Sequence, residues 1–120
     1  MIKKPNISST LLKSIIQSIE DINGQDIISL DFKKLDNRLC SYFIICSGTS
    51  NTHVKAISSN IQKKISKDLK EKPWKTEGEF TGEWILIDYS EIIVHVFQKE
   101  TREFYKLEEL WGDAKSKKYN

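Results

Sequence analysis

Hydrophobic and polar residues alternate in two neighbouring segments late in the chain, and this alternation predicts a β-hairpin. The segments are 83–88 and 91–97, with Tyr89 and Ser90 as a two-residue turn between them. This turn pairs residue 84 with 95, residue 86 with 93 and residue 88 with 91. One face of the hairpin is then entirely aliphatic: Ile85, Ile87, Ile92, Val94 and Val96. The other face mixes large apolar groups with a carboxylate and an imidazole: Trp84, Leu86, Asp88, Ile93, His95 and Phe97.

The two faces of this hairpin predict different environments. An all-aliphatic face belongs against a hydrophobic core. The mixed face is typical of a protein interface, because interfaces favour aromatic groups surrounded by polar ones. The same pattern also allows helices to cover both faces. Exposure of the mixed face to a partner is therefore a hypothesis that a structure can test.

Apolar residues at helical spacing predict two long helices before the hairpin and a short one after it. The first helix follows the capping residues 8–10 and ends at Gly24. The second follows Gly48-Thr49-Ser50 and ends before Pro73, with lysines on its polar side and an apolar stripe of Val54, Ile57, Ile61, Ile65 and Leu69. The third is capped by Thr101 and turns four apolar side chains inward: Phe104, Leu107, Leu110 and Trp111.

The remaining apolar runs predict strands at 26–32 and 41–46, with an edge strand or loop at 77–82. Strand 41–46 is apolar enough to lie in the middle of a sheet. We therefore predict an α/β fold with one domain, a mixed β-sheet of about five strands, and helices packed mainly on one face. The domain is expected to span residues 1–113, and residues 114–120 are expected to form a flexible basic tail.

Composition limits the class of protein. With 30% charged and 38% hydrophobic residues, the 120-residue chain is typical of a soluble globular domain. No apolar run approaches the roughly 20 residues that span a bilayer, and no hydrophobic stretch follows the basic start of the chain. Cys40 and Cys46 lack metal-site spacing and are expected to be free thiols in a reducing compartment. We therefore expect a cytoplasmic protein with no membrane contact.

Charge is distributed unevenly along the chain. Residues 1–76 carry 13 basic and 7 acidic side chains, whereas residues 77–113 carry 3 basic and 10 acidic ones. Three lysines then follow in the tail. The segment that holds the hairpin is therefore acidic, which argues against its docking on phosphates and favours a basic protein partner. Solvated carboxylates that only keep the domain soluble are the alternative explanation.

No catalytic or metal-binding pattern is complete in the sequence. His53 and His95 lie 42 residues apart, and no Gly-x-Ser-x-Gly elbow accompanies them. Gly48-Thr49-Ser50 after an apolar strand is similar to the turn that opens polymerase-beta-type nucleotidyltransferases. That chemistry needs paired carboxylates to bind Mg²⁺, and no Asp-x-Asp pair follows the turn. We therefore expect a protein that is not an enzyme and uses no metal or cofactor.

Seven segments together resemble the ribosomal silencing factor (Iojap) family, in the family's order and from about residue 11 to 113. They are 26–31, 42–50, 53–56, Glu77-Gly78, 84–88, 95–97 and 102–111. The resemblance implies a mixed-sheet α/β domain distantly like a nucleotidyltransferase but without its catalysis. The chain departs from the family at Ser90, where the family usually has glycine, because the turn requires a positive φ there.

The resemblance also implies a function. The family binds large-subunit ribosomal protein fourteen where the small subunit docks, which blocks subunit joining and represses translation when nutrients are short. The basic partner agrees with the acidic hairpin segment. We expect the sheet face to contribute Trp84 as the main anchor, together with Leu86, Asp88, His95 and Phe97, and we expect Glu100 and Arg102 at the rim.

Several alternatives remain open at this point. An RNA-binding module could act through the lysine-bearing helix 51–69, and an enzyme could retain a nucleotide pocket. We expect no direct nucleic-acid readout. The sequence does not choose between a monomer and a homodimer. It also assigns no role to Glu77-Gly78, or to Gly48-Thr49-Ser50 beyond capping.

Overall fold

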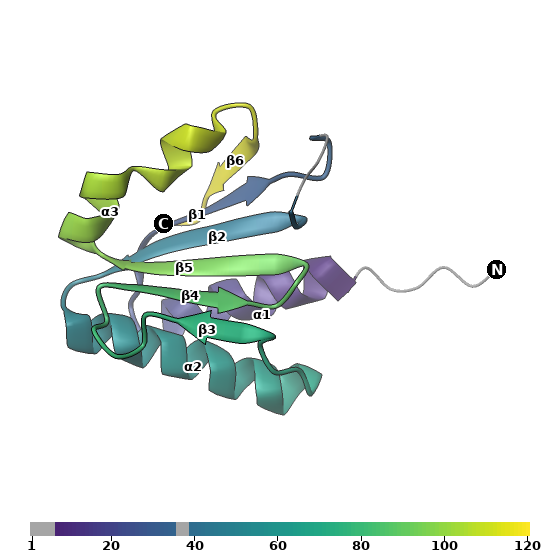
Figure 1. Ribbon diagram of the computed structural model, residues 1–120. Helices are drawn as coiled ribbons and strands as arrows, with labels where there is room; N and C mark the ends of the chain where they lie inside the picture. Colours follow the sequence, from purple (N-terminus) through teal and green to yellow (C-terminus); the bar gives the residue numbers. More distant parts are fainter. Residues whose placement is uncertain (1–6, 36–38) are drawn as a thin grey trace.

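The computed structural model describes residues 7–35 and 39–120, which form one α/β unit (Figure 1). In chain order its elements are α1 (Ile7–Asp21), β1 (Gln25–Asp31), β2 (Tyr42–Gly48), α2 (Asn51–Leu69), β3 (Lys75–Glu77), β4 (Trp84–Asp88), β5 (Ile92–Gln98), α3 (Lys99–Tyr105), the 3₁₀ helix η1 (Leu107–Trp111) and β6 (Lys115–Lys118).

The strands form a single sheet in the order β3-β4-β5-β2-β1-β6. Strands β2 and β5 run parallel, and the other neighbours run antiparallel. The predicted mixed sheet is therefore confirmed, with six strands where about five were expected. Strand β2 lies in its interior, as its continuous apolar run predicts.

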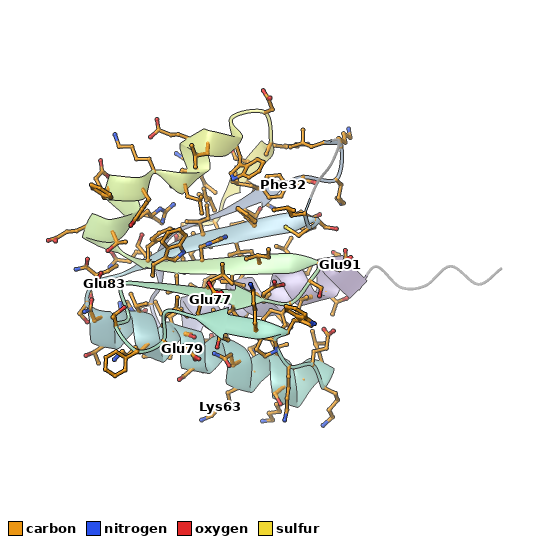
Figure 2. The ribbon with its side chains drawn as sticks, viewed as in Figure 1. Phe32, Lys63, Glu77, Glu79, Glu83 and Glu91 are labelled. Atoms are coloured by element: carbon orange, nitrogen blue, oxygen red, sulfur yellow. The ribbon has the colours of Figure 1, made fainter. Side chains whose placement is uncertain are left out.

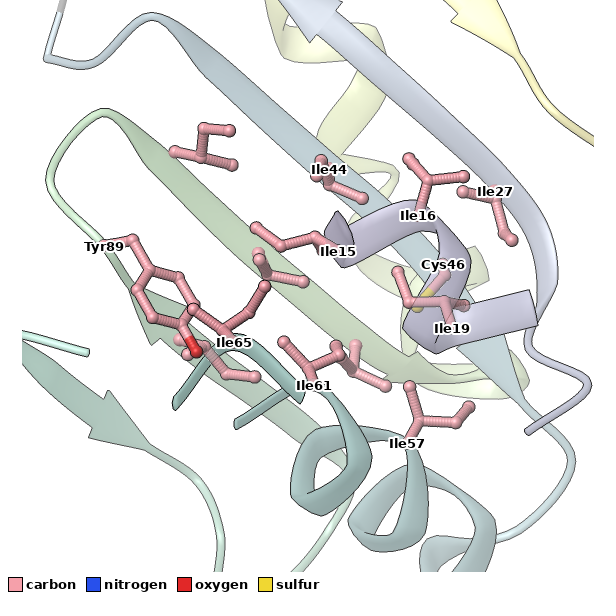
Figure 3. Close-up of a cluster of buried hydrophobic side chains, with 14 of the residues drawn as sticks. Ile15, Ile16, Ile19, Ile27, Ile44, Cys46, Ile57, Ile61, Ile65 and Tyr89 are labelled. Atoms are coloured by element: carbon pink, nitrogen blue, oxygen red, sulfur yellow. The ribbon is translucent and has the colours of Figure 1, made fainter. Parts of the chain in front are cut away.

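One face of the sheet packs against α1 and α2 and forms the main core (Figure 3). Helix α2 buries Val54, Ile57, Ile61 and Ile65, as the predicted stripe requires. The aliphatic hairpin face meets these helices through Ile85, Ile87, Ile92, Val94 and Val96. Both long helices lie on this side, in agreement with the prediction (Figure 1).

The opposite face is partly covered by residues 99–114, which we call the C-terminal cover. It consists of α3, η1 and the turn that follows them, and neither α3 nor η1 contains a fully buried residue. Beneath it lies a second apolar cluster of Leu30, Phe32, Cys40, Phe43, Ile45 and Phe97. The C-terminal cover is thus a thin layer on a sheet face whose own side chains supply the buried surface.

The hairpin register differs from the prediction by two residues. Trp84 pairs with Phe97 and Asp88 pairs with Ile93, because the turn consists of Ser90 and Glu91 rather than Tyr89 and Ser90. The Tyr89 N–H donates to the Ile92 carbonyl at 2.9 Å and closes the turn. Tyr89 is drawn into the strand because its ring is buried in the main core. A shift of two keeps every side chain on its predicted face.

Ser90 has the positive φ expected of it, at 71°. The Glu91 N–H donates to the Tyr89 carbonyl across Ser90 at 2.8 Å, and together with this positive φ that bond is the pattern of a γ-turn. The Ser90 N–H donates to Asp88 Oδ1 at 2.7 Å, and this bond helps a serine to occupy a position that favours glycine.

The predicted flexible tail is wrong. Residues 115–118 form β6, which pairs antiparallel with β1 from Ile28 to Asp31. Tyr119 and Asn120 then bond back to the main chain: Tyr119 N–H to the Ile27 carbonyl, and Asn120 Nδ2 to the Gly24 carbonyl. The lysines suggested a tail because they bury nothing, but the backbone of a strand can pair without burying its side chains.

The helix boundaries also differ from the predictions. Helix α1 begins at Ile7, before the predicted capping residues, and α3 begins at Lys99, before Thr101. Helix α2 ends at Leu69, with Lys70 left-handed, four residues before Pro73. Gly24 is required for packing as well as for ending the helix, because an added Cβ would lie 2.2 Å from Ile19 Cγ2.

Candidate functional site

The mixed hairpin face lies on the side of the sheet away from α1 and α2, and its exposure is graded along the strands. Trp84, Leu86, Asp88 and Ile93 are half-buried. His95 and Phe97 are buried, with 4% and 0% of their surface exposed. The expectation that both would be open to a partner is therefore wrong. A sequence pattern assigns a side chain to a face, and only the fold decides how much of that face is covered.

Trp84 is held in place by its neighbours. Its indole Nε1–H donates to His95 Nδ1 at 3.1 Å, and its ring stacks on Phe97 with centroids 4.7 Å apart. Tyr105 of α3 approaches the other side, at 5.0 Å between ring centroids. The indole is therefore preorganised at the border between the covered and the open parts of the face.

His95 acts in this structure as a hydrogen-bond acceptor that holds the Trp84 ring. Burial lowers the pKa of its imidazole from 6.5 to about 4, so the ring is neutral near pH 7. Since Nδ1 accepts the hydrogen bond from Trp84 Nε1–H, the ring proton lies on Nε2. Among the described residues, Nε2 has no hydrogen-bond partner. The centroid of the Phe43 ring lies 4.5 Å from that of the imidazole, and this ring contributes to the burial of His95.

Arg102 bonds inward and does not occupy the exposed rim that the sequence suggested. Its Nη1 donates to the Asp26 carbonyl at 2.7 Å and to Ser47 Oγ at 2.9 Å. Its Nη2 and Nε both reach Glu108 Oε2, at 2.8 and 2.9 Å. Only 12% of the side chain is exposed. Arg102 therefore clamps α3 and η1 to the ends of β1 and β2.

Glu100, the other predicted rim residue, is exposed. It lines a shallow groove of about 480 Å³ at the end of the sheet where α2 and α3 begin, together with Asn51, Glu83, Gln98, Thr101, Phe104 and Tyr105. Glu83 lies at this end of the sheet and Glu91 at the other, with Glu77 and Glu79 near β3 (Figure 2). In the groove itself, the carboxylates of Glu83 and Glu100 lie beside the rings of Phe104 and Tyr105.

The C-terminal cover exposes apolar side chains that were predicted to point inward. Phe104 and Leu110 are 79% and 72% exposed, and Tyr105 is 51% exposed. Trp111 lies at the border, because its ring contacts Phe32 and Phe43 at 5.1 and 5.9 Å while a third of its surface is open. Leu107 is half-buried and also packs against the second cluster, as predicted. The break between α3 and η1 disrupts the helical spacing on which the prediction relied.

These exposed groups enlarge the candidate surface. We define the acidic aromatic surface as Trp84, Leu86, Asp88, Glu100, Phe104 and Tyr105, with Glu83 beside them. Phe104 and Tyr105 were not predicted as surface residues. The signal that could have found them is their position between Glu103 and Lys106, within a short segment rich in charge.

The two sequence signatures without an assigned role, Gly48-Thr49-Ser50 and Glu77-Gly78, both contribute to the local backbone structure. Ser50 Oγ caps α2 by accepting the His53 N–H at 3.0 Å. The His53 ring accepts the Thr49 N–H at Nδ1 and donates from Nε2 to the Ile22 carbonyl, which ties α2 to the end of α1. Gly78 has φ +83°, and an added Cβ would lie 2.0 Å from the Trp84 carbonyl oxygen.

Within residues 7–35 and 39–120, no three His, Cys, Asp or Glu side chains gather closely enough to hold a metal ion. Both cysteines are free and buried. No helix in the described part of the chain combines the length and hydropathy that crossing a bilayer requires.

Comparison with known proteins identifies the family. A family model described as "Ribosomal silencing factor during starvation" matches residues 5–120. A ribosomal silencing factor of Chromobacterium violaceum is 40% identical over 103 residues, covering 86% of this chain and 83% of the relative. The chain belongs to the ribosomal silencing factor family. Membership implies ribosome-associated repression, and the predicted resemblance is confirmed.

Solved structures and an organellar relative extend this finding. A crystal structure of a Chromobacterium violaceum protein superimposes with a TM-score of 0.81 at 38% identity, covering 87% of this chain and 85% of that one. A mouse relative named "Mitochondrial assembly of ribosomal large subunit protein 1" is 33% identical over 100 residues, covering 81% of this chain and 43% of its own length. The ribosomal silencing factor fold thus extends over most of this chain.

Proposed function

We propose that this ribosomal silencing factor binds the large ribosomal subunit through ribosomal protein fourteen and sterically blocks joining of the small subunit. Translation would thereby be repressed under nutrient limitation. The mouse relative's name also refers to the large ribosomal subunit, which supports this choice of subunit. Steric blocking requires a rigid surface and close contacts but no reacting groups.

The observation that carries the proposal is the acidic aromatic surface. Phe104 and Tyr105 expose their rings beside Glu83 and Glu100 around a shallow groove. Exposed aromatic groups provide contact area at low entropic cost, and carboxylates orient a lysine- or arginine-rich partner. Residues 77–113 have a net charge of −7 from 3 basic and 10 acidic side chains, which suits a basic ribosomal protein.

The seven residues expected at the interface now have different proposed roles. Trp84, Leu86, Asp88 and Glu100 are proposed to touch the partner. His95 and Phe97 are buried beneath and are proposed to act by holding the Trp84 ring. Arg102 is proposed to act by holding the C-terminal cover in place.

The direct test follows 70S formation from purified subunits by sedimentation. Excess protein is expected to leave the subunits separate, and Phe104→Ala should weaken this effect about tenfold, because an exposed aromatic anchor contributes roughly 1–2 kcal/mol. Phe80→Ala is the matched control, since Phe80 is 92% exposed on the β3–β4 loop outside the acidic aromatic surface.

The possible outcomes separate the parts of the proposal. Unimpaired joining in the presence of excess wild-type protein would refute the function. Equal loss of effect in both variants would refute the location of the surface. Pull-down of isolated ribosomal protein fourteen by the same three proteins identifies the partner. Trp84→Ala is a less clean test, because it also removes the bond to His95 and the stacking on Phe97.

A further inference from the structure

Strand β6 places lysines along one outer edge of the sheet. Its four residues are all exposed, and it is the last strand in the sheet order, at the end opposite β3. Among the described residues, no ion pair includes Lys115, Lys117 or Lys118. Lys33 follows the neighbouring strand β1, and its Nζ lies 4.0 Å from Asp31 Oδ2. We call Lys33, Lys115, Lys117 and Lys118 the lysine edge.

Two members of the lysine edge, Lys115 and Lys117, line a small hollow, so the edge is more than a row of solvated side chains. The hollow has a volume of about 230 Å³ and is lined by Leu12, Ser29, Asp31, Tyr42, Lys115, Ser116, Lys117 and Tyr119. Two tyrosine rings in its wall each lie close to an ammonium group. Lys33 Nζ lies 4.9 Å from the Tyr42 ring centroid, and Lys117 Nζ lies 5.1 Å from that of Tyr119.

These ring contacts restrict ammonium groups that would otherwise move freely. The Tyr119 hydroxyl is itself bonded to Ser29 Oγ at 2.9 Å, so the ring beneath Lys117 is held by β1. Asp31 is the single carboxylate in the hollow, and Lys33 is near enough to neutralise it. Lys115 and Lys117 therefore leave an excess of positive charge around the hollow.

The acidic and basic segments of the sequence meet where the C-terminal cover joins β6. Asp113 ends the acidic segment, and Lys115 begins the basic strand two residues later. The acidic aromatic surface lies on β4 and α3, and the lysine edge lies at β6 in the same sheet, with β5, β2 and β1 between them. A single particle that presents a basic protein beside an anionic polymer would satisfy both surfaces.

We propose that the lysine edge contacts phosphate groups of ribosomal RNA beside the protein that the acidic aromatic surface binds. This inference rests on the proposed function and adds a second point of attachment. Lysine ammonium groups bind phosphate as point charges and carry no base information. The contact therefore adds affinity and orientation without sequence readout. It is distinct from RNA binding through helix 51–69, whose lysines lie on another side of the molecule.

The test compares two triple variants with equal loss of charge. One is Lys115→Gln/Lys117→Gln/Lys118→Gln. The control is Lys63→Gln/Lys67→Gln/Lys72→Gln, which removes three exposed lysines on and just after α2; Lys63 lies at the solvent side of that helix (Figure 2). Affinity of the full chain for purified large subunits is measured from 50 to 300 mM salt, and affinity for isolated ribosomal protein fourteen is measured in parallel.

The β6 triple variant is expected to bind large subunits at least tenfold more weakly at low salt. Its slope of log affinity against log salt should be shallower by about 2–3, since each lost phosphate contact removes about one unit. Its affinity for the isolated protein and the slope of the α2 variant should stay unchanged. If the triple variant does not fold, Lys115→Gln and Lys117→Gln are measured singly, each with a slope change of about one.

The outcomes distinguish this inference from the proposed function. A wild-type chain that binds neither the subunit nor the isolated protein refutes both. Normal binding with an unchanged slope in the β6 variant overturns the inference alone. In that case, self-association of the variant would assign these lysines to protecting the sheet edge. A slope change confined to the α2 variant would also overturn the inference and place the RNA contact on that helix.

Discussion

The His95 imidazole lies beside the Phe43 and Phe97 rings and accepts one hydrogen bond from Trp84. The alternating pattern of the hairpin correctly assigned Trp84, His95 and Phe97 to one face. It could not rank their exposure, because that depends on a cover contributed by residues later in the chain. At the scale of single residues, the histidine is therefore a neutral acceptor that fixes an indole.

This placement predicts a pH dependence of stability. The folded pKa of His95 is about 4 and the ordinary value is 6.5, so the unfolded chain binds the extra proton more readily. The stabilisation is fully present above about pH 6.5 and is lost as the pH falls towards 4, by on the order of 3 kcal/mol. Urea unfolding of the wild-type chain between pH 7.5 and 4.5 measures this loss.

His95→Gln provides the control for that titration. Glutamine can accept the Trp84 N–H but does not ionise in this range, so the variant should lose less stability on acidification than the wild type. Other carboxyl groups titrate equally in both proteins and cancel in the difference. Parallel pH profiles for the two proteins would contradict the assignment of a depressed pKa to His95.

At the scale of a structural element, Arg102 holds the C-terminal cover on the sheet. Neither α3 nor η1 buries a residue completely, so hydrophobic packing alone holds the C-terminal cover weakly. The guanidinium bonds to Asp26, Ser47 and Glu108 join α3 and η1 to two strands. Sequence pattern could not predict these bonds, because the three partners are distant from Arg102 in the chain or separated from it by a helix break.

Arg102→Gln should therefore loosen the C-terminal cover more than the rest of the domain. We expect amide hydrogen exchange in residues 99–111 to rise at least tenfold, with little change in β2 and β5. Binding to the large subunit should weaken as well, because Phe104 and Tyr105 lie on the C-terminal cover. Glu103→Gln is the control, since Glu103 is exposed on the same helix and has no ion pair among the described residues. Equal exchange in the two variants would show that Arg102 is not the clamp.

At the scale of the whole molecule, residues 114–120 contribute more to the stability of the sheet than their lysine-rich composition suggests. Strand β6 covers the outer edge of β1, and Asn120 Oδ1 accepts the Ile27 N–H at 2.9 Å. Sheet edges that are left open invite pairing with another copy. Residues 114–120 therefore cover the edge of β1, and the lysine-bearing β6 becomes the outer strand.

Removing residues 114–120 should consequently destabilise the domain. Several backbone hydrogen bonds at about 0.5–1.5 kcal/mol each amount to roughly 2–3 kcal/mol, or a fall of about 10 °C in Tm. Calorimetry measures the shift, and sedimentation shows whether the bared β1 edge promotes self-association. A truncated protein with the Tm of the full chain would restore the interpretation of this segment as a free tail.

The local pattern predicted most of the fold but only part of the candidate site. Apolar spacing identified α2 and its stripe, alternation identified the two hairpin faces, and a continuous apolar run placed β2 inside the sheet. The hairpin turn was predicted one residue too early, because burial of Tyr89 decides where the strand ends. Phe104 and Leu110 were predicted inward, because the helix break after Tyr105 was not visible in the spacing.

The sequence by itself determined the α/β class, the facing of each strand residue, the family resemblance and the separation of acidic from basic segments. These follow from periodicity, composition and motif order, which are properties of neighbouring residues. The tertiary structure alone decided that His95 and Phe97 are covered, that Arg102 turns inward and that the lysine-rich end becomes a strand. Each of these depends on contacts between segments far apart in the chain, where burial and hydrogen-bond geometry exist only after folding.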